Sequence, residues 1–428
     1  MRVVVVGGGV IGLTSAYHLL KDGHEVTLVD AGAFGAGASH GNAGYVVPSD
    51  AAPVPAPGMV LKALRWMLHR DSPLYVRPSL RPDVARFMLA MASRCNAADF
   101  DAAFRANLLL CEHAMDLLDA YAADGVRFEM HRQGYLSVYA DEHGLAHRVA
   151  DLATPTEYGM EPEVLTGREL TEREPALLPS LAGGVYFPHD RHLRPDTLMT
   201  GLVDRCAELG VKLVDHAAVI RIRGDTRVRA VETTTGVVEG EEFLLAAGAH
   251  TTPLARSIGV RLPIRPGKGY SLDYLPAPVQ VSCSINLADA KVAVTPLDGR
   301  LRLAGTMEFA GLDHEVNPLR VRAIQAAPSR YFAGWQPGSV EHTEPWAGIR
   351  PMTPDGLPVI GRLPGWDNAW VAAGHGMLGV TLGPATGQGI AEAIGSGHVP
   401  ERLAPFTPTR FLSRSGRPRM RPRPTTPT

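Results

Sequence analysis

A glycine-rich turn near the start of the chain has the residue types and spacing that bind a dinucleotide. It matches the pattern GxGxxG and consists of Gly7, Gly8, Gly9, Val10, Ile11 and Gly12. Glycine at the three fixed places permits a tight turn, close approach of a pyrophosphate to the backbone, and close packing of a helix on a strand. Asp30 lies 18 residues beyond Gly12, where its carboxylate would accept hydrogen bonds from an adenosine ribose. An acid at that place argues against the 2′-phosphate of NADP, so the turn predicts FAD or NAD.

The residues around this turn predict the βαβ unit that such a site needs. Residues 3–6 are four consecutive valines, which favour a buried strand. A helical pattern follows the turn, and residues 25–29 are an expected second strand that leads to Asp30. Glycine-rich turns are common, and a structural turn without a nucleotide is the alternative. The strand, the helix and the acid together favour the dinucleotide.

Small and polar residues after the acid favour FAD over NAD. Residues 39–44 read Ser-His-Gly-Asn-Ala-Gly, whereas a plain NAD-binding fold would go on to its third parallel strand. The extended diphosphate and ribityl chain of a flavin nucleotide needs such a stretch beside it. The candidate FAD contacts in this segment are Ser39, Asn42, Ala43 and Gly44.

A second GxGxxG occupies residues 374–379, directly after a short apolar run at 369–373. No strand ending in an acid follows it, so we interpret it as the turn that opens the last helix and not as a second nucleotide site. The N-terminus of that helix would direct backbone N–H groups at a flavin ring and stabilise negative charge on the reduced ring. The candidate cofactor contacts are Gly374, Gly376, Gly379 and Thr381, together with Gly248 in an Ala-Ala-Gly-Ala turn.

Composition narrows the class of protein further. The chain has 428 residues, of which 45% are hydrophobic and 20% charged, as in ordinary folded proteins. Its four cysteines lack CxxC spacing, so neither a metal site nor a disulfide framework is predicted. No signal-peptide pattern is present and no run approaches the about 18 apolar residues of a membrane span, which predicts a cytoplasmic protein. A net charge of −2 argues against a nucleic-acid partner.

These patterns predict an α/β fold, α+β overall, made of two parts. The first part is a discontinuous Rossmann-like FAD-binding domain that takes in residues 1–85, 190–262 and 346–412. The second is a mainly antiparallel β-sheet domain for the substrate, which takes in residues 86–189 and 263–345. Residues 413–428 carry five arginines and no acids, and they predict a disordered basic tail.

With these motifs in place, the chain resembles the D-amino-acid oxidase superfamily from residue 1 to about residue 408. The segments 57–67 and 346–356 look most like those of the bacterial D-amino-acid dehydrogenases. The resemblance implies oxidative deamination of D-amino acids to 2-oxo acids and ammonia, by hydride transfer from Cα to the flavin N5. Segment 188–196 departs from the alanine-type dehydrogenases, which leaves D-hydroxyproline, D-proline, glycine and sarcosine open as substrates. No cysteine stands near Met352 to link the flavin, so FAD is expected to be non-covalent.

Three residues are candidates for contact with the substrate. Arg350 lies in the sequence Gly-Ile-Arg-Pro, where related oxidases place an arginine that binds the substrate carboxylate; a guanidinium does so through two parallel hydrogen bonds. Tyr270 follows Gly-Lys-Gly at the start of an expected strand and could close the site with its hydroxyl, although an aromatic residue on a strand is more often part of the core. His375 stands between two glycines beside the expected flavin ring. A proton-transfer role for it is not needed, because hydride transfer requires a neutral amine and close alignment.

Two features concern partners other than the substrate. Segment 58–70 has the composition of a basic amphipathic helix, which would either pack on its own domain or touch the inner face of a membrane. Similar dehydrogenases pass electrons to a membrane quinone, so the resemblance implies a quinone or another acceptor, with oxygen as the alternative. The arginines of the tail raise a different alternative, an RNA-associated flavoprotein. A nucleotide-binding protein without redox activity is a further alternative function.

Overall fold

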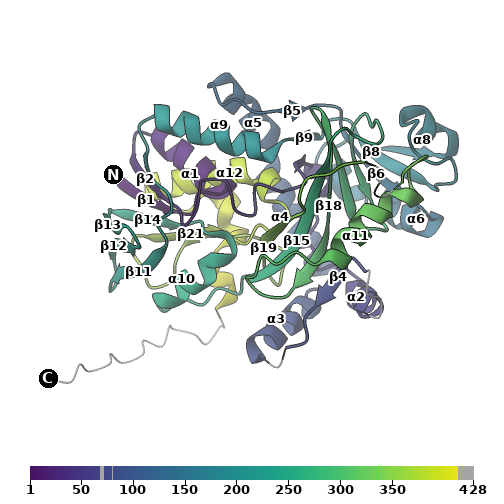
Figure 1. Cartoon of the computed structure of the whole chain (residues 1–428). Helices are drawn as coiled ribbons and strands as arrows, with labels where there is room; N and C mark the ends of the chain where they lie inside the picture. The colour runs from purple at the N-terminus through teal and green to yellow at the C-terminus, as the bar shows by residue number, and fades with distance from the viewer. Residues whose placement is uncertain (68–71, 80, 337, 339, 413–428) are drawn as a thin grey trace.

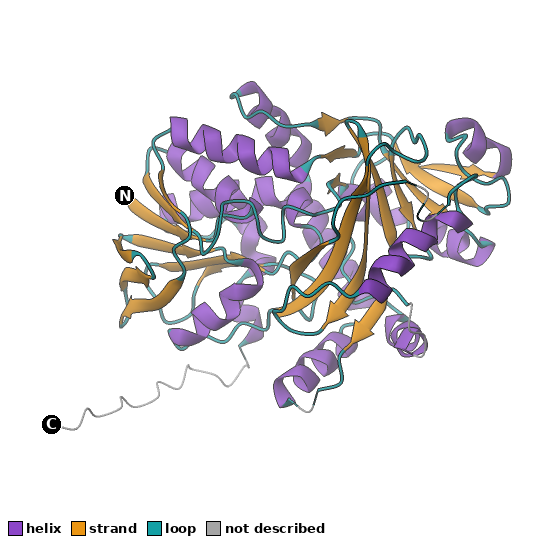
Figure 2. Ribbon diagram, viewed as in Figure 1, coloured by secondary structure: helices purple, strands orange, loops and turns teal. Residues whose placement is uncertain are grey.

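The computed structural model describes residues 1–67, 72–79, 81–336, 338 and 340–412. The expected tail at 413–428 and residues 68–70 of the expected amphipathic helix lie outside the described residues. Two sheets dominate the fold, and they stand side by side in Figures 1 and 2, one in the half that holds the N-terminus and one in the other half. The mixed α/β class predicted from the sequence is confirmed.

The first sheet has six strands in the order β10-β2-β1-β14-β21-β20. All neighbours pair in parallel except β20 and β21, which are antiparallel. The strands are β1 (Arg2–Val6), β2 (Glu25–Val29), β10 (Lys212–Val214), β14 (Glu242–Leu245), β20 (Val359–Arg362) and β21 (Ala369–Ala373). The valine strand β1 is central and buried, as a parallel strand covered on both faces must be.

Helices cover one face of this sheet and a small sheet lies on the other. The helices α1 (Val10–Lys21), α9 (Pro195–Glu208) and α12 (Gly379–Ser396) share one apolar core with the strands. The opposite face packs on β11 (Val219–Gly224), β12 (Val228–Thr233), β13 (Gly236–Glu239) and α10 (Thr251–Ser257). A chain that leaves and re-enters one parallel sheet brings residues 7–12, 248 and 374–379 to the same edge.

The second sheet runs β19-β15-β18-β17-β16-β6-β8-β7, with β4 paired to β18 outside this path. It is mainly antiparallel, with parallel pairs at β16–β6 and β18–β4. Its strands are β4 (Leu74–Val76), β6 (Tyr135–Tyr139), β7 (Glu163–Thr166), β8 (Gly183–Phe187), β15 (Arg265–Tyr274), β16 (Ser284–Leu287), β17 (Val292–Leu297), β18 (Arg300–Phe309) and β19 (Trp346–Met352). The hairpin across Asp298 and Gly299 is present as predicted.

The remaining elements connect and flank the two sheets. A small sheet, β3-β9-β5, is formed by β3 (Tyr45–Val46), β9 (Arg191–Leu193) and β5 (Met130–His131). The helices are α2 (Met59–Met67), α3 (Pro82–Ser93), α4 (Ala97–Cys111), α5 (Ala114–Ala123), α6 (Glu142–Ala150), α7 (Ala153–Glu157), α8 (Gly167–Arg173) and α11 (Pro318–Ala326), with 3₁₀ turns at Pro48–Asp50, Gly248–His250, Ala327–Arg330, Glu401–Phe406 and Pro408–Phe411. In the part of the chain that the structure describes, no helix is long and apolar enough to cross a bilayer.

The predicted division of the chain needs correction at three places. Strand β19 pairs with β15 over seven residue pairs, so residues 346–352 belong to the substrate sheet and not to the FAD-binding part. Strand β4, within 1–85, also pairs with the substrate sheet. Conversely, α4 and α5 lie within 86–189, yet their apolar residues join the core around α1 and α12. Pairings between segments so far apart in the chain leave no local pattern in the sequence.

Candidate active site

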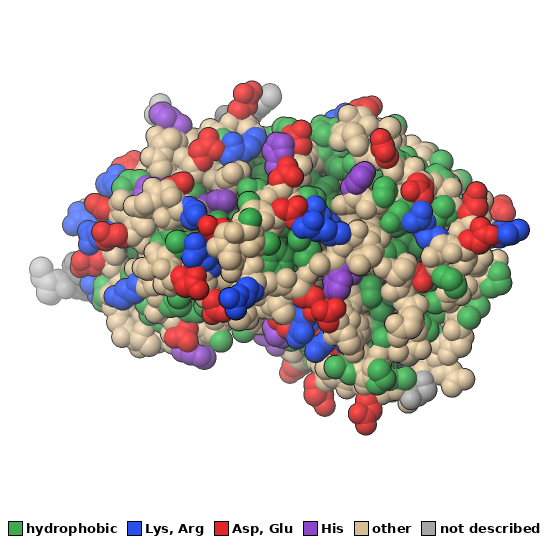
Figure 3. Space-filling model, turned by 90° about the horizontal axis from the view of Figure 1, so that it is seen from above, with side chains coloured by type: hydrophobic (Ala, Val, Ile, Leu, Met, Phe, Trp, Pro, Cys, Tyr) green, Lys and Arg blue, Asp and Glu red, His purple; other side chains and the backbone are tan. Residues whose placement is uncertain are grey.

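A cavity of about 1360 Å³ runs from the glycine turn of α1 to the face of the substrate sheet. Small-molecule pockets usually measure about 300–1,000 Å³, so this one has room for an extended dinucleotide and a substrate together. Gly7, Gly9, Val10 and Ile11 line one end, and Arg350 lines the other. On the face drawn in Figure 3, acidic and basic side chains are interspersed over both halves, so this face has no basic region for a nucleic acid.

The nucleotide end of the cavity is shaped by contacts that only glycine allows. Gly7 has φ 112°, and a Cβ there would lie 2.5 Å from the Ala246 carbonyl oxygen. A Cβ on Gly12 would lie 1.7 Å from the Gly7 carbonyl oxygen, so α1 packs directly on the turn. The first bond inside α1 runs from the Leu13 amide to the Gly9 carbonyl, which leaves the preceding amides at the helix N-terminus. Amides in this position would bind a pyrophosphate.

Two polar side chains hold this turn in shape. Asp30 accepts hydrogen bonds from the amides of Gly8, at 2.6 Å, and Gly32, at 2.8 Å, and it also lines the cavity. Ser39 accepts a hydrogen bond from the Val10 amide at 3.0 Å through its Oγ. The carboxylate of Asp30 therefore stands at the nucleotide end, as the sequence predicts, and it also fixes the glycine turn itself.

The segment after Ser39 crosses from the nucleotide end to the substrate sheet. Asn42 accepts a hydrogen bond from the Gly44 amide at 2.8 Å, and the carbonyl of Ala43 accepts one from Thr295 on β17 at 2.7 Å. Gly44 has φ 82°, and a Cβ there would lie 2.0 Å from the Leu193 carbonyl oxygen. Asn42 and Ala43 line the cavity, whereas Gly44 provides the close approach to β9 behind it.

The glycine turn before α12 lies between the two ends. Gly376 and Gly379 line the cavity beside Gly248, and Gly374 packs behind them against Thr353. Thr381 also lines the cavity, and its hydroxyl donates to the Tyr45 carbonyl at 3.1 Å. The N-terminus of α12 therefore opens toward the space where a flavin ring would sit.

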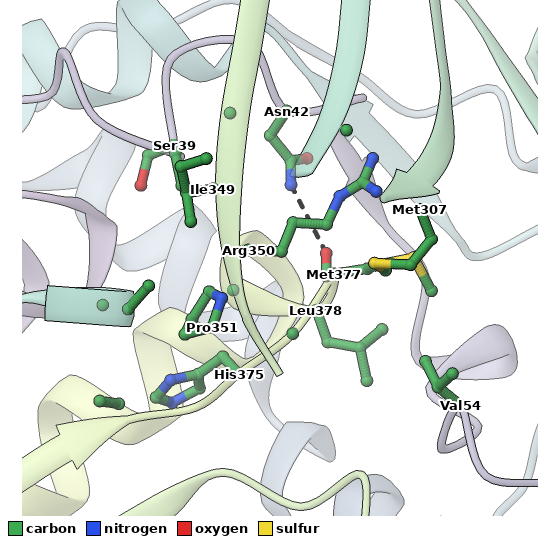
Figure 4. Close-up of a pocket in the computed structure, with 18 of the residues that line it drawn as sticks. Ser39, Asn42, Val54, Met307, Ile349, Arg350, Pro351, His375, Met377 and Leu378 are labelled. Atoms are coloured by element: carbon green, nitrogen blue, oxygen red, sulfur yellow. Dashed lines mark hydrogen bonds between the residues drawn. The ribbon is translucent and has the colours of Figure 1, made fainter. Parts of the chain in front are cut away.

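His375 is buried in this turn and is electrically neutral. Its Nε2 lies 3.0 Å from the Thr386 hydroxyl, and its Nδ1 has no hydrogen-bond partner among the described residues. Burial lowers the pKa of His375 to about 3, so the ring carries no charge near neutral pH. In Figure 4 it lies beside Pro351, at the opposite end of the view from the Arg350 guanidinium. Its position fits a contact with the flavin and not a role as a proton donor.

Arg350 projects into the substrate end from β19. Its Nη1 donates to the carbonyl of Thr306 on β18 at 2.5 Å. A Cβ on Gly269 would lie 2.2 Å from the Arg350 Cζ, so this glycine lets the guanidinium lie flat across β15. Among the described residues it forms no ion pair, and burial lowers the pKa of Arg350 to about 10. A guanidinium that faces a cavity without a counter-ion is a site for an anion.

Tyr270 does not face the same way, and the expectation that its hydroxyl contacts the substrate is corrected. Gly267 pairs with Arg350 and Tyr270 pairs with Ala347, so strand alternation places Tyr270 on the face opposite Arg350. Although the residue borders the cavity, its hydroxyl donates to Glu308 at 2.8 Å. Tyr270 is buried in the apolar core of the substrate sheet, which is the more common role of an aromatic residue on a strand.

Comparison with known proteins decides the family. The family model described as FAD dependent oxidoreductase matches residues 2–393. A D-amino acid dehydrogenase from Azorhizobium caulinodans is 35% identical to the chain, and the match covers 94% of this chain and 97% of the relative. A D-amino acid dehydrogenase from Vibrio atlanticus is 32% identical, and the match covers 92% of this chain and 96% of the relative.

This chain belongs to the FAD-dependent oxidoreductase family. Among solved structures, glycine oxidase from Geobacillus kaustophilus superposes with a TM-score of 0.74 at 25% identity, over 96% of this chain and 100% of that one. L-proline dehydrogenase from P. horikoshii superposes with a TM-score of 0.74 at 20% identity, over 96% of this chain and 97% of that one.

The residues present fit the FAD of this family. The amides at the N-terminus of α1 and the carboxylate of Asp30 would hold the diphosphate and the adenosine ribose. The unpaired Nδ1 of His375 and the turn before α12 would contact the flavin ring. Bound FAD supplies an acceptor for a hydride. The cofactor predicted from the glycine turns is therefore confirmed at the level of the family.

Sequence reasoning missed several residues at the substrate end. Trp346 lies across Gly41 and Gly348, where a Cβ would fall 2.1 Å and 2.0 Å from its ring atoms. The carbonyl of Thr306 orients Arg350, and Lys291 lines the cavity from the turn before β17. Trp346 is the first residue of segment 346–356, which resembles the bacterial D-amino-acid dehydrogenases, so the sequence did contain a signal for it. The other two depend on strand register, which no local pattern fixes.

Proposed function

We propose that this FAD-dependent oxidoreductase oxidises D-amino acids to 2-oxo acids and ammonia. The observation that carries the proposal is the unpaired guanidinium of Arg350 at the far end of the cavity that begins at the dinucleotide turn. A carboxylate is the anion that such a fork binds in two parallel hydrogen bonds. The D-amino acid dehydrogenases that are 35% and 32% identical over most of their length support the D-configuration.

The residues of the chain bind and orient the substrate. Arg350 holds the carboxylate, and the Thr306 carbonyl fixes the direction of the guanidinium. Trp346 and the buried Ile349 also line the cavity. The neutral ring of His375 does not add a positive charge that would repel the substrate ammonium. Loss of the ammonium proton to water leaves the neutral amine that hydride removal from Cα needs.

Anaerobic reduction of the flavin tests this proposal. The purified protein should be yellow, and acid precipitation should release the colour because FAD is held non-covalently. A panel of D-amino acids, their L-enantiomers, glycine, sarcosine and D-proline should bleach the flavin to different extents, with D-amino acids fastest. Faster bleaching by glycine or sarcosine would favour the amine-oxidase alternative. A colourless protein would contradict the family assignment as well.

We also propose that the electrons pass to a membrane quinone and that α2 meets the inner face of the cytoplasmic membrane. None of the nine residues of α2 is buried, and Leu61 and Met67 are 66% and 53% exposed. Lys62 and Arg65 stand among these apolar residues, which suits an anionic lipid surface. Met59, Ala63 and other residues of α2 also line the cavity, so a membrane-bound acceptor would reach the flavin from this side.

A charge placed on α2 tests the membrane contact. Leu61→Glu should lower binding to vesicles that contain anionic lipid by about tenfold, because a carboxylate would enter the interface. Val237→Glu is the matched control, since Val237 is 51% exposed on β13 in the other half of the molecule. Equal loss in both variants, or no vesicle binding by the unaltered protein, would contradict the contact.

A further inference from the structure

Lys291 brings a second positive charge to the substrate end of the cavity. It lies in the turn between β16 and β17 and lines the cavity together with Arg350. Its φ of 55° is in the left-handed region, where glycine or asparagine is the usual residue. A lysine held in this conformation is strained, and such strain is found most often at functional sites.

No acid pairs directly with Lys291 in the part of the chain that the structure describes. Among the described residues its ammonium forms no hydrogen bond or close ion pair, and Asp50 and Asp289 are the acids near enough to attract it. The Oδ2 of Asp50 accepts a hydrogen bond from the Tyr135 hydroxyl at 2.8 Å. The Oδ2 of Asp289 accepts one from the Ala140 amide, also at 2.8 Å. Each carboxylate thus contacts another donor, and each attracts the ammonium only from a distance.

The other charged groups that act on Lys291 are positive. Burial lowers the pKa of Lys291, and repulsion by Lys62 and Arg148 lowers it further, against the attraction of Asp50 and Asp289. An ammonium in such a place gains most from an anion that enters with a ligand. The electrostatics therefore favour a negatively charged group in this part of the cavity.

Strand register places the backbone of Lys291 beside the residue that orients Arg350. Val292 pairs with Gly305, which brings Lys291 next to Thr306, and the Lys291 carbonyl would lie 3.2 Å from a Cβ on Gly305. The carbonyl of Thr306 accepts the hydrogen bond from Arg350. Neighbouring strands lie about 4.8 Å apart, and the lysine stem is flexible, so the ammonium and the guanidinium can reach two ends of one small molecule.

Small residues on the sheet leave open space in the cavity between Arg350 and Lys291. Gly269, Ala293 and Ala304 line the cavity on the sheet beneath them. A substrate whose α-carboxylate pairs with Arg350 can therefore extend its side chain over these small residues toward Lys291. A neutral side chain would leave the ammonium unpaired in a partly closed space, whereas a carboxylate would neutralise it.

We propose that Lys291 binds a carboxylate on the side chain of the substrate, which makes acidic D-amino acids the preferred substrate class. The inference rests on the proposed function, because it assigns the α-carboxylate to Arg350. D-Glutamate and D-aspartate have the chemistry that the two cations recognise. D-Glutamine matches D-glutamate in shape and lacks the charge.

The experiment compares D-glutamate with D-glutamine by anaerobic flavin bleaching. The unaltered protein should show a ratio of kcat/KM of about tenfold or more in favour of D-glutamate, and Lys291→Met should bring that ratio close to one. Methionine occupies the same left-handed backbone as poorly as lysine, so the substitution tests the charge. Lys291→Glu should reverse the preference toward D-lysine. Lys212→Met, at the exposed first residue of β10, should leave the ratio unchanged.

The outcomes separate this inference from the function on which it rests. If neutral D-amino acids bleach the flavin and D-glutamate has no advantage over D-glutamine, the role of Lys291 is overturned and the proposed function stands. An unchanged ratio in Lys291→Met overturns it in the same way. If no D-amino acid bleaches the flavin, the proposed function fails and the inference fails with it.

Discussion

The two ends of the cavity are built in different ways. The nucleotide end comes from a contiguous turn, Gly7 to Gly12, with Asp30 bound to the same turn through the amides of Gly8 and Gly32. The substrate end comes from single residues on β15, β18 and β19, joined by sheet pairing. The shape of a contiguous turn is fixed by residues that are close in the sequence. A site assembled from several strands depends instead on the pairing register of each neighbouring pair of strands.

This difference predicts that substitutions at the two ends affect separate properties. A change at the substrate end should alter turnover and leave the bound cofactor in place. A change at the nucleotide end should release the cofactor and leave the substrate preference of the remaining holoenzyme unaltered. The first three substitutions below test that separation, from the largest expected effect to the smallest, and a fourth tests a buried acid outside the cavity.

The glycine beneath Arg350 should be the most sensitive position. In Gly269→Ala the added Cβ would lie 2.2 Å from the Arg350 Cζ, so the guanidinium must move. A displacement of about 1 Å in a positioning group can cost about a hundredfold, and we expect a fall of that size in kcat/KM with full FAD content. Gly395→Ala, where the added Cβ would make an ordinary 3.4 Å contact, is the control. Loss of FAD along with activity would contradict the separation.

Arg350→Lys should come next. Lysine keeps the charge and loses the fork, so we expect a loss of about 1.5–3 kcal/mol of transition-state stabilisation, which is about a ten- to hundredfold fall in kcat/KM. The matched decarboxylated amine should lose less, because it never used the contact. Arg402→Lys, on the surface beside Glu392, is the control. A drop in thermal midpoint and FAD content with unchanged preference for carboxylated substrates would show that Arg350 is structural.

Asp30→Ala tests the nucleotide end. It removes the predicted ribose contact and two hydrogen bonds that hold the turn, at 2.6 Å and 2.8 Å. Hydrogen bonds to a charged group are worth about 1.5–3 kcal/mol, so FAD should bind at least about tenfold more weakly. Equilibrium dialysis of the apoprotein measures this. After Asp30→Ala is reloaded with FAD, its preference for D- over L-enantiomers should equal that of the unaltered enzyme. The surface variant Asp116→Ala is the control, and it should bind FAD as tightly as the unaltered protein. Undiminished FAD affinity in Asp30→Ala would contradict the assignment.

The last prediction concerns stability and pH, and we expect no effect on FAD content or substrate preference. Burial raises the pKa of Asp190 to about 8, while an unfolded aspartate titrates near about 3.9. The folded protein therefore keeps a proton that the unfolded chain releases. This contribution to stability is complete below about pH 4 and is lost as the pH rises toward about 8. Asp190→Asn, which mimics the protonated acid that accepts from Ser49, should flatten the fall in thermal midpoint between about pH 5 and about pH 8. An identical slope in both proteins would contradict the buried proton.

The same contrast explains which parts of the site could be predicted from the sequence. The glycine turns, Asp30, the helices α1, α9 and α12, and the hairpin of β17 and β18 all follow from local patterns, and all are present. Tyr270 was misplaced because its face depends on the pairing of Arg350 with Gly267, 83 residues apart in the chain. Lys291 has no local signal, since its nearness to Arg350 arises through β18.

Anaerobic mixing of the purified protein with a D-amino acid, followed at the flavin absorbance, tests the central claim most directly. The account predicts a yellow protein whose flavin is bleached by D-amino acids much faster than by their L-enantiomers. It also predicts at least about tenfold slower bleaching at limiting substrate in Arg350→Lys, in which the yellow colour is retained. A flavin that no D-amino acid reduces, or one that Arg350→Lys reduces as fast as the unaltered protein, would contradict it.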